Sequence, residues 1–331
     1  MKGFDAEFTD LDHYIRVITD RIWDGRQIED IRLYYSDDCA VETPSNVSIG
    51  IEPVIAGTKA TLVTFPDRRL LAEDVIISGD ENNGFLSSHR IFSPMTHAGD
   101  GSFGPPSNKA VYARTIADCV CINNRIVHEW LVRDQAAIAR QIGLNEKIIA
   151  QRWLAQAAGS QKAVMPPAPS GYFSVIDHDP TAQRYAAVYQ SLWSSVRSAD
   201  NPLNRIEKCL AGAYQARAIV AVPGGETCVG LAPLAQFWLM LRQALPNATL
   251  SIEHLIANHR EGRATSVAIR WRVASTLEGL GRYGQPTGAP VEVMGIAHAD
   301  FVDNKIVREW ILFDDVAIWM QILDPSAGSK H

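Results

Sequence analysis

Apolar residues recur at spacings of three and four in two short runs near the start of the chain. The runs are Ile15, Ile18 and Ile22, followed by Ile28, Ile31 and Tyr35. This spacing predicts two amphipathic helices, with Gly25 as the break between them. In the second half of the chain, residues 231–245 predict a helix that Pro246 ends.

Alternation with a period of two follows later in each half. Residues 264–276 and 291–302 alternate between apolar and polar positions, which predicts strands. Asparagine-containing pairs predict hairpin turns into a last strand, at Asn123-Asn124 and at Asp303-Asn304. Residues 135–143 and 315–323 predict closing helices. We therefore expect each half to be α+β, with helices followed by an antiparallel sheet.

The long strand of each half has one face built from small residues. These residues are Val111, Ala113, Thr115, Ala117, Cys119 and Cys121 in the first half, and Val291, Val293, Gly295, Ala297, Ala299 and Phe301 in the second. Helices that pack on small side chains either approach closely or leave a hollow. We favour a hollow, because ligand pockets are mostly apolar and concave. Thr115 and Ala117 are therefore expected to contact a ligand.

The two halves are copies of each other. Residues 90–142 match residues 270–322 at a shift of 180 without a gap, with Arg90/Arg270, Trp130/Trp310 and Asp134/Asp314 among the identities. Upstream, Tyr34/Tyr214, Gly50/Gly230 and Pro66/Pro246 keep the same shift. A duplication predicts two domains rather than a solenoid, which needs at least three shorter repeats.

The length of 331 residues also suits two domains. We place the first copy at residues 1–144 and the second at 172–325. Between them, residues 145–171 predict a helix over 145–161 and then a Pro-rich linker.

Charge and cysteine content narrow the class of protein. The net charge of −6 and the absence of a Lys/Arg patch argue against a nucleic-acid partner. The longest strongly apolar stretch, residues 231–241, is too short to span a membrane, and the acidic N-terminus is no secretory signal. Five cysteines without a C-x-x-C motif argue against disulfides and a zinc site. We expect a cytoplasmic protein with no metal and no cofactor.

Two motifs resemble those of a known family. Residues 96–107, THAGDGSFGPPS, are similar to a T-H-x-G…G-x-P-P-T turn, and residues 125–130, RIVHEW, with Asp134 and then 140–143, RQIG, are similar to a K-I-x-E-x-W…D…R-Q-L-G ending. Both belong to SnoaL-like polyketide cyclases, in the superfamily of nuclear transport factor 2, ketosteroid isomerase and scytalone dehydratase. The resemblance implies a cone: a curved mixed sheet wrapped by helices around a deep pocket.

Members of this family usually pair through their sheets. The resemblance therefore implies that the two copies form an internal pseudo-dimer, and a homo-oligomer of the chain stays open. The outer strand faces suit a mixed interface, because they carry Tyr112, Arg114 and Asp118 in one copy and Glu292, Met294 and His298 in the other.

The resemblance also implies an aspartate just after the Trp position, with a histidine on the preceding strand. These places hold Leu131 and Ala117 in the first copy, and Ile311 and Ala297 in the second. Leu and Ala cannot abstract a proton, so any catalysis must use other groups.

Elimination leaves His97, Asp134 and Arg90 as the catalytic candidates, all in the first copy, because the second copy has Leu277 in place of His97. Each has a competing interpretation: a loop histidine bonded to backbone, a helix N-cap, and a buried arginine paired with Glu129. Further candidates for ligand contact are Arg270, Asp314, Trp130 and Trp310. Their competing interpretations are an ion pair for Arg270, a helix N-cap for Asp314 and core packing for the two tryptophans.

Three interpretations of the function remain. One is cofactor-free acid/base chemistry (cyclisation, isomerisation or hydrolysis) on an apolar carbonyl compound. Another is non-catalytic binding of such a small molecule by the same fold, and a structural or regulatory pseudo-dimer with closed pockets is the third. We favour the enzyme, with the first copy as the active one.

Overall fold

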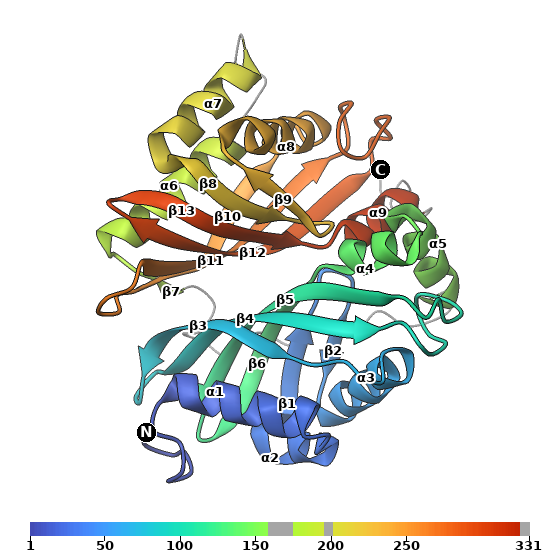
Figure 1. Ribbon diagram of the computed structural model, residues 1–331, viewed down its shortest axis with the longest axis vertical. Helices are drawn as coiled ribbons and strands as arrows, with labels where there is room; N and C mark the ends of the chain where they lie inside the picture. Colours follow the sequence, from blue (N-terminus) through green and yellow to red (C-terminus); the bar gives the residue numbers. More distant parts are fainter. Residues whose placement is uncertain (158–174, 195–200, 325–331) are drawn as a thin grey trace. The chain divides into compact units, whose positions relative to one another are not determined.

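The computed structural model describes residues 1–157, 175–194 and 201–324. The chain divides into two compact units, Met1–Phe173 and Ser174–His331, drawn in Figure 1. The predicted helix after the first copy is present as α5 (Glu146–Ala157), and its predicted end at 158–161 and the Pro-rich linker lie outside the described residues. The predicted sheet-to-sheet packing of the two copies stays a prediction.

The first unit is a six-stranded sheet with helices. Its elements in chain order are α1 (Leu11–Thr19), a π-helical turn (Asp20–Asp24), a 3-10 turn (Ile28–Asp30), α2 (Ile31–Tyr34), β1 (Tyr35–Glu42), β2 (Val47–Ile49), α3 (Ile51–Thr64), β3 (Leu71–Asp80), β4 (Gly84–Thr96), β5 (Ala110–Ile122), β6 (Arg125–Arg133), α4 (Gln135–Ile142) and α5. The strand order is β2-β1-β6-β5-β4-β3. The sheet is mixed, because β1 runs parallel to β6 while β3, β4, β5 and β6 pair antiparallel.

The second unit repeats this plan. Its elements are β7 (Val175–Ile176), α6 (Pro180–Trp193), α7 (Pro202–Ala213), β8 (Tyr214–Val222), β9 (Glu226–Val229), α8 (Leu231–Ala244), β10 (Thr249–Asn258), β11 (Thr265–Thr276), β12 (Pro290–Val302), β13 (Lys305–Phe313) and α9 (Asp315–Leu323). The order β7-β10-β11-β12-β13-β8-β9 matches the first sheet, with β7 added at one edge. Both units are therefore α+β, and the fold class expected from the resemblance is confirmed.

The early part of each copy was predicted wrongly in two respects. It contains strands as well as helices, so the sheet is not purely antiparallel. Tyr35 begins β1 instead of ending a helix, because it pairs in parallel with Ile126 and is buried there. Its counterpart Tyr214 pairs with Ile306 in the same way, so the structural match is Tyr35/Tyr214 rather than Tyr34/Tyr214.

The predicted turns and helix ends are confirmed where local chemistry sets them. Asn123 and Asn124 have φ values of 48° and 67°, and Asp303 and Asn304 have 50° and 62°, as a two-residue hairpin of type I′ requires.

The glycine-rich motif at residues 96–107 also has a structural role. A Cβ on Gly99 would lie 1.9 Å from the Val63 carbonyl oxygen, so only glycine lets this loop cap the end of α3.

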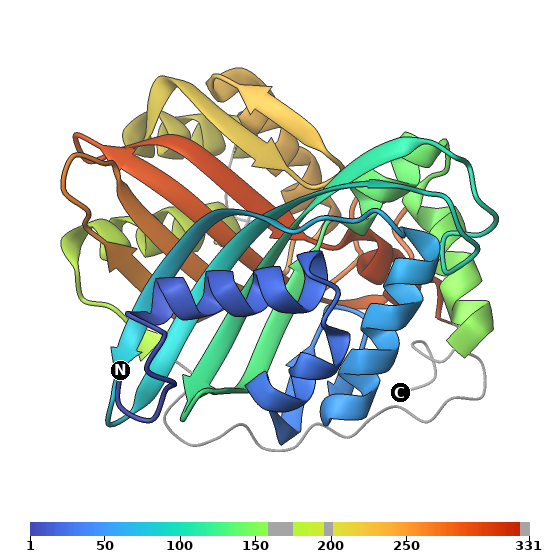
Figure 2. The ribbon, with the colours of Figure 1, turned by 60° about the horizontal axis from the view of Figure 1, so that its bottom comes forward.

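Helices cover one face of the first sheet, as Figure 2 shows for α1, α2 and α3. Tyr14, Ile15 and Ile18 of α1 pack in one apolar core with Ala117 and Cys119 of β5. We call the sheet surface that carries Ala117 and Cys119 the helix-covered face. The small-residue face predicted from the sequence is this surface, so Thr115 and Ala117 point towards the helices. No described helix is long and apolar enough to cross a membrane.

Candidate functional site

Strand register places a group of polar residues on the helix-covered face of the first copy. Residues directly opposite each other in an antiparallel pair share a face. Three rows run across β4, β5 and β6: Ser87–Cys119–Glu129, His89–Ala117–Leu131 and Ile91–Thr115–Arg133. Ser93 lies on the same face, opposite Ala113. Because α1 packs on this face, these polar side chains point into the domain.

Several of these polar groups are buried without a hydrogen-bond partner among the described residues. They are the hydroxyls of Ser93 and Thr115 and Nε2 of His89, in side chains that are 1%, 1% and 3% exposed. Buried polar groups are normally hydrogen-bonded, because leaving one unpaired costs about 1–3 kcal/mol. A cluster of three marks this face as a candidate site.

The second copy has an apolar surface at the same positions. Val267, Ile269, Val273 and Phe313 replace Ser87, His89, Ser93 and Arg133, and Gly295 replaces Thr115. A Cβ on Gly295 would lie 2.1 Å from a ring carbon of Trp271. This ring packs against Trp193 and Phe313 at centroid distances of 5.5 and 6.2 Å. Aromatic side chains thus fill the second interior, and the polar site belongs to the first copy alone.

Glu129 is the acidic group of the helix-covered face. Its carboxylate accepts a hydrogen bond from the Tyr35 hydroxyl at 3.1 Å. Burial raises the pKa of Glu129 to about 7, against the opposing effects of the Tyr35 hydrogen bond and the positive charge of Arg133. A carboxyl group with this pKa exchanges protons readily near neutral pH.

Glu309 is the counterpart of Glu129 and is enclosed differently. It accepts hydrogen bonds from three hydroxyls, those of Tyr185 at 2.7 Å, Tyr189 at 3.1 Å and Tyr214 at 2.6 Å. Burial raises its pKa to about 7 as well. Three tyrosine hydroxyls therefore donate to Glu309, whereas among the described residues one tyrosine hydroxyl, that of Tyr35, donates to Glu129.

His89 is the second titratable group of this face. Burial lowers its pKa to about 3, and the positive charge of Arg16 contributes in the same direction. His89 is therefore neutral at pH 7. A neutral imidazole can donate a hydrogen bond from one ring nitrogen while it stays uncharged.

A cleft of about 360 Å³ lies at the end of β6 in the first copy. Its walls include Thr64, Phe65, Phe103, Arg133, Gln135 and Trp153. Arg133 also shares a row with Thr115 on the helix-covered face. This residue therefore connects the cleft with the polar row.

His97 holds one wall of the cleft without lining it. Its Nδ1 accepts a hydrogen bond from the Ser107 backbone N–H at 3.2 Å, and the ring packs on Phe65 and Phe103 at centroid distances of 5.6 and 6.4 Å. Burial lowers the pKa of His97, against the opposing effects of the Gly104 backbone and of the charge of Asp100. The predicted catalytic role of His97 stays a prediction, and this geometry supports a positioning role.

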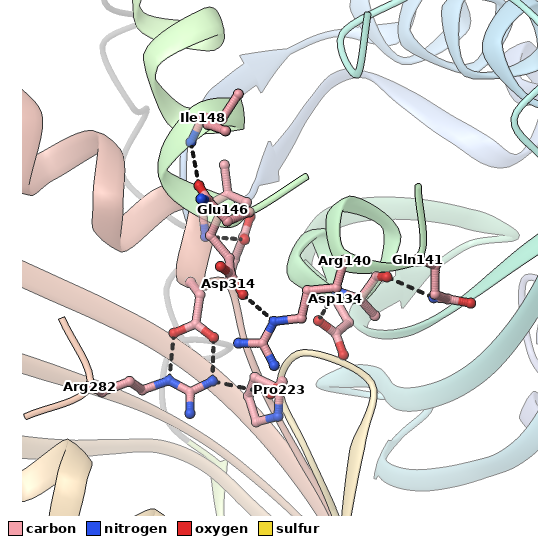
Figure 3. Close-up of polar contacts among 12 residues, drawn as sticks. Asp134, Arg140, Gln141, Glu146, Ile148, Pro223, Arg282 and Asp314 are labelled. Atoms are coloured by element: carbon pink, nitrogen blue, oxygen red, sulfur yellow. Dashed lines mark hydrogen bonds and ion pairs between the residues drawn. The ribbon is translucent and has the colours of Figure 1, made fainter. Parts of the chain in front are cut away.

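Asp134 and Asp314 are helix N-caps, as the competing interpretation held. Asp134 accepts the Ala137 N–H at 2.9 Å at the start of α4, and Asp314 accepts the Val316 N–H at 2.9 Å at the start of α9. Figure 3 shows Asp134 beside α4. Their predicted roles towards a ligand stay predictions.

Arg90 and Arg270 form ion pairs, but not with the predicted partner. Arg90 Nε lies 3.1 Å from Glu73, and Arg270 Nε lies 3.2 Å from Glu253. Glu129 cannot serve, because side chains alternate along a strand and Glu129 lies on the other face. The expected pairing of Arg90 with Glu129 was therefore wrong.

The predicted site residues are thus divided between two faces. Thr115 and Ala117 lie on the helix-covered face. Arg90 and Trp130 lie on the opposite face, where Trp130 is opposite Asp118, and Trp310 likewise is opposite His298. His89 and the site role of Glu129 were not predicted from the sequence. Comparing inward positions between the copies could have found His89, because its counterpart is Ile269.

In the described part of the chain, no group of three or more His, Cys, Asp or Glu side chains is placed to hold a metal ion.

Comparison with known proteins finds solved structures that are similar to part of the chain. Wild-type IdmH from Streptomyces antibioticus is 19% identical and matches 40% of this chain and 96% of its own, with a TM-score of 0.35. TsrD from Streptomyces laurentii is 16% identical over 42% and 98%, with a TM-score of 0.36. A SnoaL-like polyketide cyclase from Agrobacterium tumefaciens is 19% identical over 41% and 99%, with a TM-score of 0.34. No curated protein matches the chain.

A family model matches the sequence of each copy. The model of the SnoaL-like polyketide cyclase family matches residues 14–142 and again residues 185–322, which together make up more than half of the chain. Each match covers most of the strands and helices of one unit. The chain therefore belongs to the SnoaL-like polyketide cyclase family and contains two tandem copies of its domain.

Proposed function

We propose that the first copy is a cofactor-free acid/base catalyst that acts on an apolar carbonyl compound, and that the second copy is a non-catalytic scaffold. The observation that carries this proposal is the polar helix-covered face of the first copy, whose counterpart in the second copy is apolar apart from the tyrosine-bonded Glu309 and is filled by aromatic rings.

Glu129 is the proton-transfer group in this proposal. Its carboxylate takes a proton from the carbon next to the carbonyl, so that a C–H bond breaks and an O–H bond forms on Glu129. The electron pair of that bond moves to the carbonyl oxygen as an enolate. A pKa of about 7 suits this role, because a useful fraction of Glu129 is ionised at neutral pH and the protonated form can return the proton.

His89 stabilises the enolate oxygen by donating a hydrogen bond from Nε2. A neutral donor suffices, because a preorganised hydrogen bond in a buried site stabilises developing negative charge. Glu129 and His89 lie on β6 and β4, two strand spacings apart and in neighbouring rows offset by two residues along the strands, which puts them about 12 Å apart. Ala117 lies on the strand between them, directly opposite His89, and has a small side chain.

The experiment measures hydrogen exchange next to a ketone. The probe is 1-(2-naphthyl)propan-2-one in D₂O, followed by proton NMR after the protein has been treated with a chelator and dialysed. The native protein should accelerate exchange, and Glu129→Gln should lower the rate by about 10²–10⁴-fold. The matched substitution Glu309→Gln should leave exchange intact. Equal losses in both variants, or no effect of Glu129→Gln, would reject Glu129 as the base.

A second candidate function is binding without catalysis. Ala117 and Leu131 favour it, because they stand where the family resemblance implies the acid/base pair. In that case the ketone would bind with no exchange above the buffer rate. This function would be selected if the native protein bound the ketone without catalysing its hydrogen exchange, and if Glu129→Gln bound the ketone equally well.

A further inference from the structure

A buried arginine lacks a counter-ion near Phe65, which lines the cleft and accepts the backbone N–H of this arginine at 3.1 Å. Arg68 is 5% exposed, in the segment between α3 and β3. Its side chain makes no hydrogen bond or ion pair with the residues that the structure describes. The charges that act on it most strongly are those of Arg133 and Arg26, both positive. Burying a charge without a partner costs several kcal/mol, so such a group is retained where it has a use.

The nearby carboxylate of Asp24 is already occupied. One of its oxygens accepts hydrogen bonds from Arg69 Nε and Nη2 at 3.1 and 3.0 Å, and the other accepts the Leu70 N–H at 2.8 Å. Arg69 is largely exposed, with 61% of its side chain accessible. The exposed Arg69 therefore pairs with Asp24, and the buried Arg68 next to it does not.

The segment that carries Arg68 is held in place by Arg26. The Arg26 guanidinium donates to the carbonyl oxygens of Trp23 at 3.0 Å, Pro66 at 2.8 Å and Arg68 at 3.0 Å. Arg26 also has a φ of 60°, in the left-handed region that non-glycine residues rarely adopt. Such a backbone conformation persists only where the surroundings enforce it, often at ligand-binding sites.

Arg133 links this arginine to the proposed reaction site. It lines the cleft, shares a row with Thr115, and its charge acts on both Arg68 and Glu129. In the second copy the counterparts of Arg68 and Arg133 are Ala248 and Phe313. Both arginines therefore occur only in the copy that has the polar face.

We propose that the ligand of the first copy carries a carboxylate, which Arg68 and Arg133 bind beside the cleft. This inference rests on the proposed function for the location of the site, and it adds the substrate class: a carbonyl compound with an acidic group. Guanidinium groups are suited to the role, because they stay charged and bind carboxylates through paired hydrogen bonds.

The test is calorimetric titration of the full chain with three probes: 2-naphthoate, its uncharged analogue 2-naphthamide, and inorganic phosphate. We expect 2-naphthoate to bind at least tenfold more tightly than either of the others. Arg68→Met should weaken 2-naphthoate binding at least tenfold and leave 2-naphthamide unchanged. The control Arg217→Met removes an exposed charge of the second copy and should change neither.

Three results would overturn the proposal. They are equal binding of 2-naphthoate and 2-naphthamide, phosphate binding as tight as that of 2-naphthoate, and unchanged 2-naphthoate binding in Arg68→Met. The melting temperature separates a binding role from a structural one. Without ligand, Arg68→Met should melt at or above the native temperature, because an uncompensated buried charge is removed. A lower melting temperature would show that Arg68 is structural. Arg133→Met provides an independent second variant.

The outcome is independent of the exchange experiment. Selective 2-naphthoate binding through Arg68 with no effect of Glu129→Gln on ketone exchange would retain the carboxylate site and reject the catalytic proposal. The reverse pattern would retain catalysis and reject the carboxylate site.

Discussion

His89 on β4 lies directly opposite Ala117 on β5, and Ala117 lies opposite Leu131 on β6. Ala117 and Leu131 occupy the two positions at which the family resemblance implies an acid/base pair. The titratable group of this row is therefore on the neighbouring strand. In the second copy the same row is Ile269, Ala297 and Ile311, with no titratable group.

Replacing His89 with the residue of the second copy tests its role. We expect His89→Ile to lower ketone exchange by about 10²–10³-fold, because one hydrogen-bond donor to the enolate is lost. Stability should not fall, since an unpaired buried imidazole nitrogen is exchanged for an apolar side chain. Exchange rates and thermal melting of the same preparations provide the check. Unchanged exchange in His89→Ile would exclude the donor role.

The pH dependence of stability should reflect Glu309. Its pKa is about 7 in the folded protein, above its ordinary value of 4.5. Between these values the folded state keeps a proton that the unfolded chain has lost, so stability falls as the pH rises through this window. Relative to Glu309→Gln, the native protein should therefore be more stable at pH 5 than at pH 8. If the melting temperatures of the two proteins changed equally between pH 5 and pH 8, the result would contradict the burial of an ionisable Glu309.

Asp134 provides a test that separates capping from catalysis. Asp134→Ala should cost about 1 kcal/mol of stability by removing the cap of α4, with ketone exchange nearly unchanged. Asp134→Asn keeps a side-chain oxygen that can accept the Ala137 N–H, and it should retain most of the stability. Native stability with lost exchange in Asp134→Asn would instead establish an acid/base role.

Gly295 tests how completely the second interior is filled. A Cβ there would collide with Trp271 at 2.1 Å, so Gly295→Ala should destabilise the protein by about 1–3 kcal/mol through overpacking. Gly212 has no heavy atom within 4 Å of an added Cβ. The control Gly212→Ala in α7 should therefore be neutral or stabilising. Equal stability of both variants would mean that the second interior tolerates added volume.

The duplication and the fold class were predictable because they depend on local patterns. Alternation defined β11 and β12, and Asn123-Asn124 specified a hairpin by backbone preference. Tyr35 was misplaced because one residue at the junction of two elements fits either period, and the parallel pairing with Ile126 decides it. Parallel partners are distant in sequence, so no local pattern reveals them.

The site was less predictable, because it depends on register. His89 and Glu129 are far apart in sequence and meet on one face only after β4, β5 and β6 are aligned. The elimination that led to His97 considered motif positions and not the rows across the sheet. The N-cap interpretation of Asp134 was available from the sequence, because a cap depends on neighbours within three residues.

The pH profile of ketone exchange shows directly whether Glu129 is the base. If Glu129 is the base, the rate catalysed by the native protein should rise with pH through a midpoint near 7, as the carboxyl ionises. Glu129→Gln should abolish this rise and lower the rate about 10²–10⁴-fold, while Glu309→Gln should keep both rate and midpoint. A native profile without a midpoint near 7, or one that Glu129→Gln retains, would contradict the account.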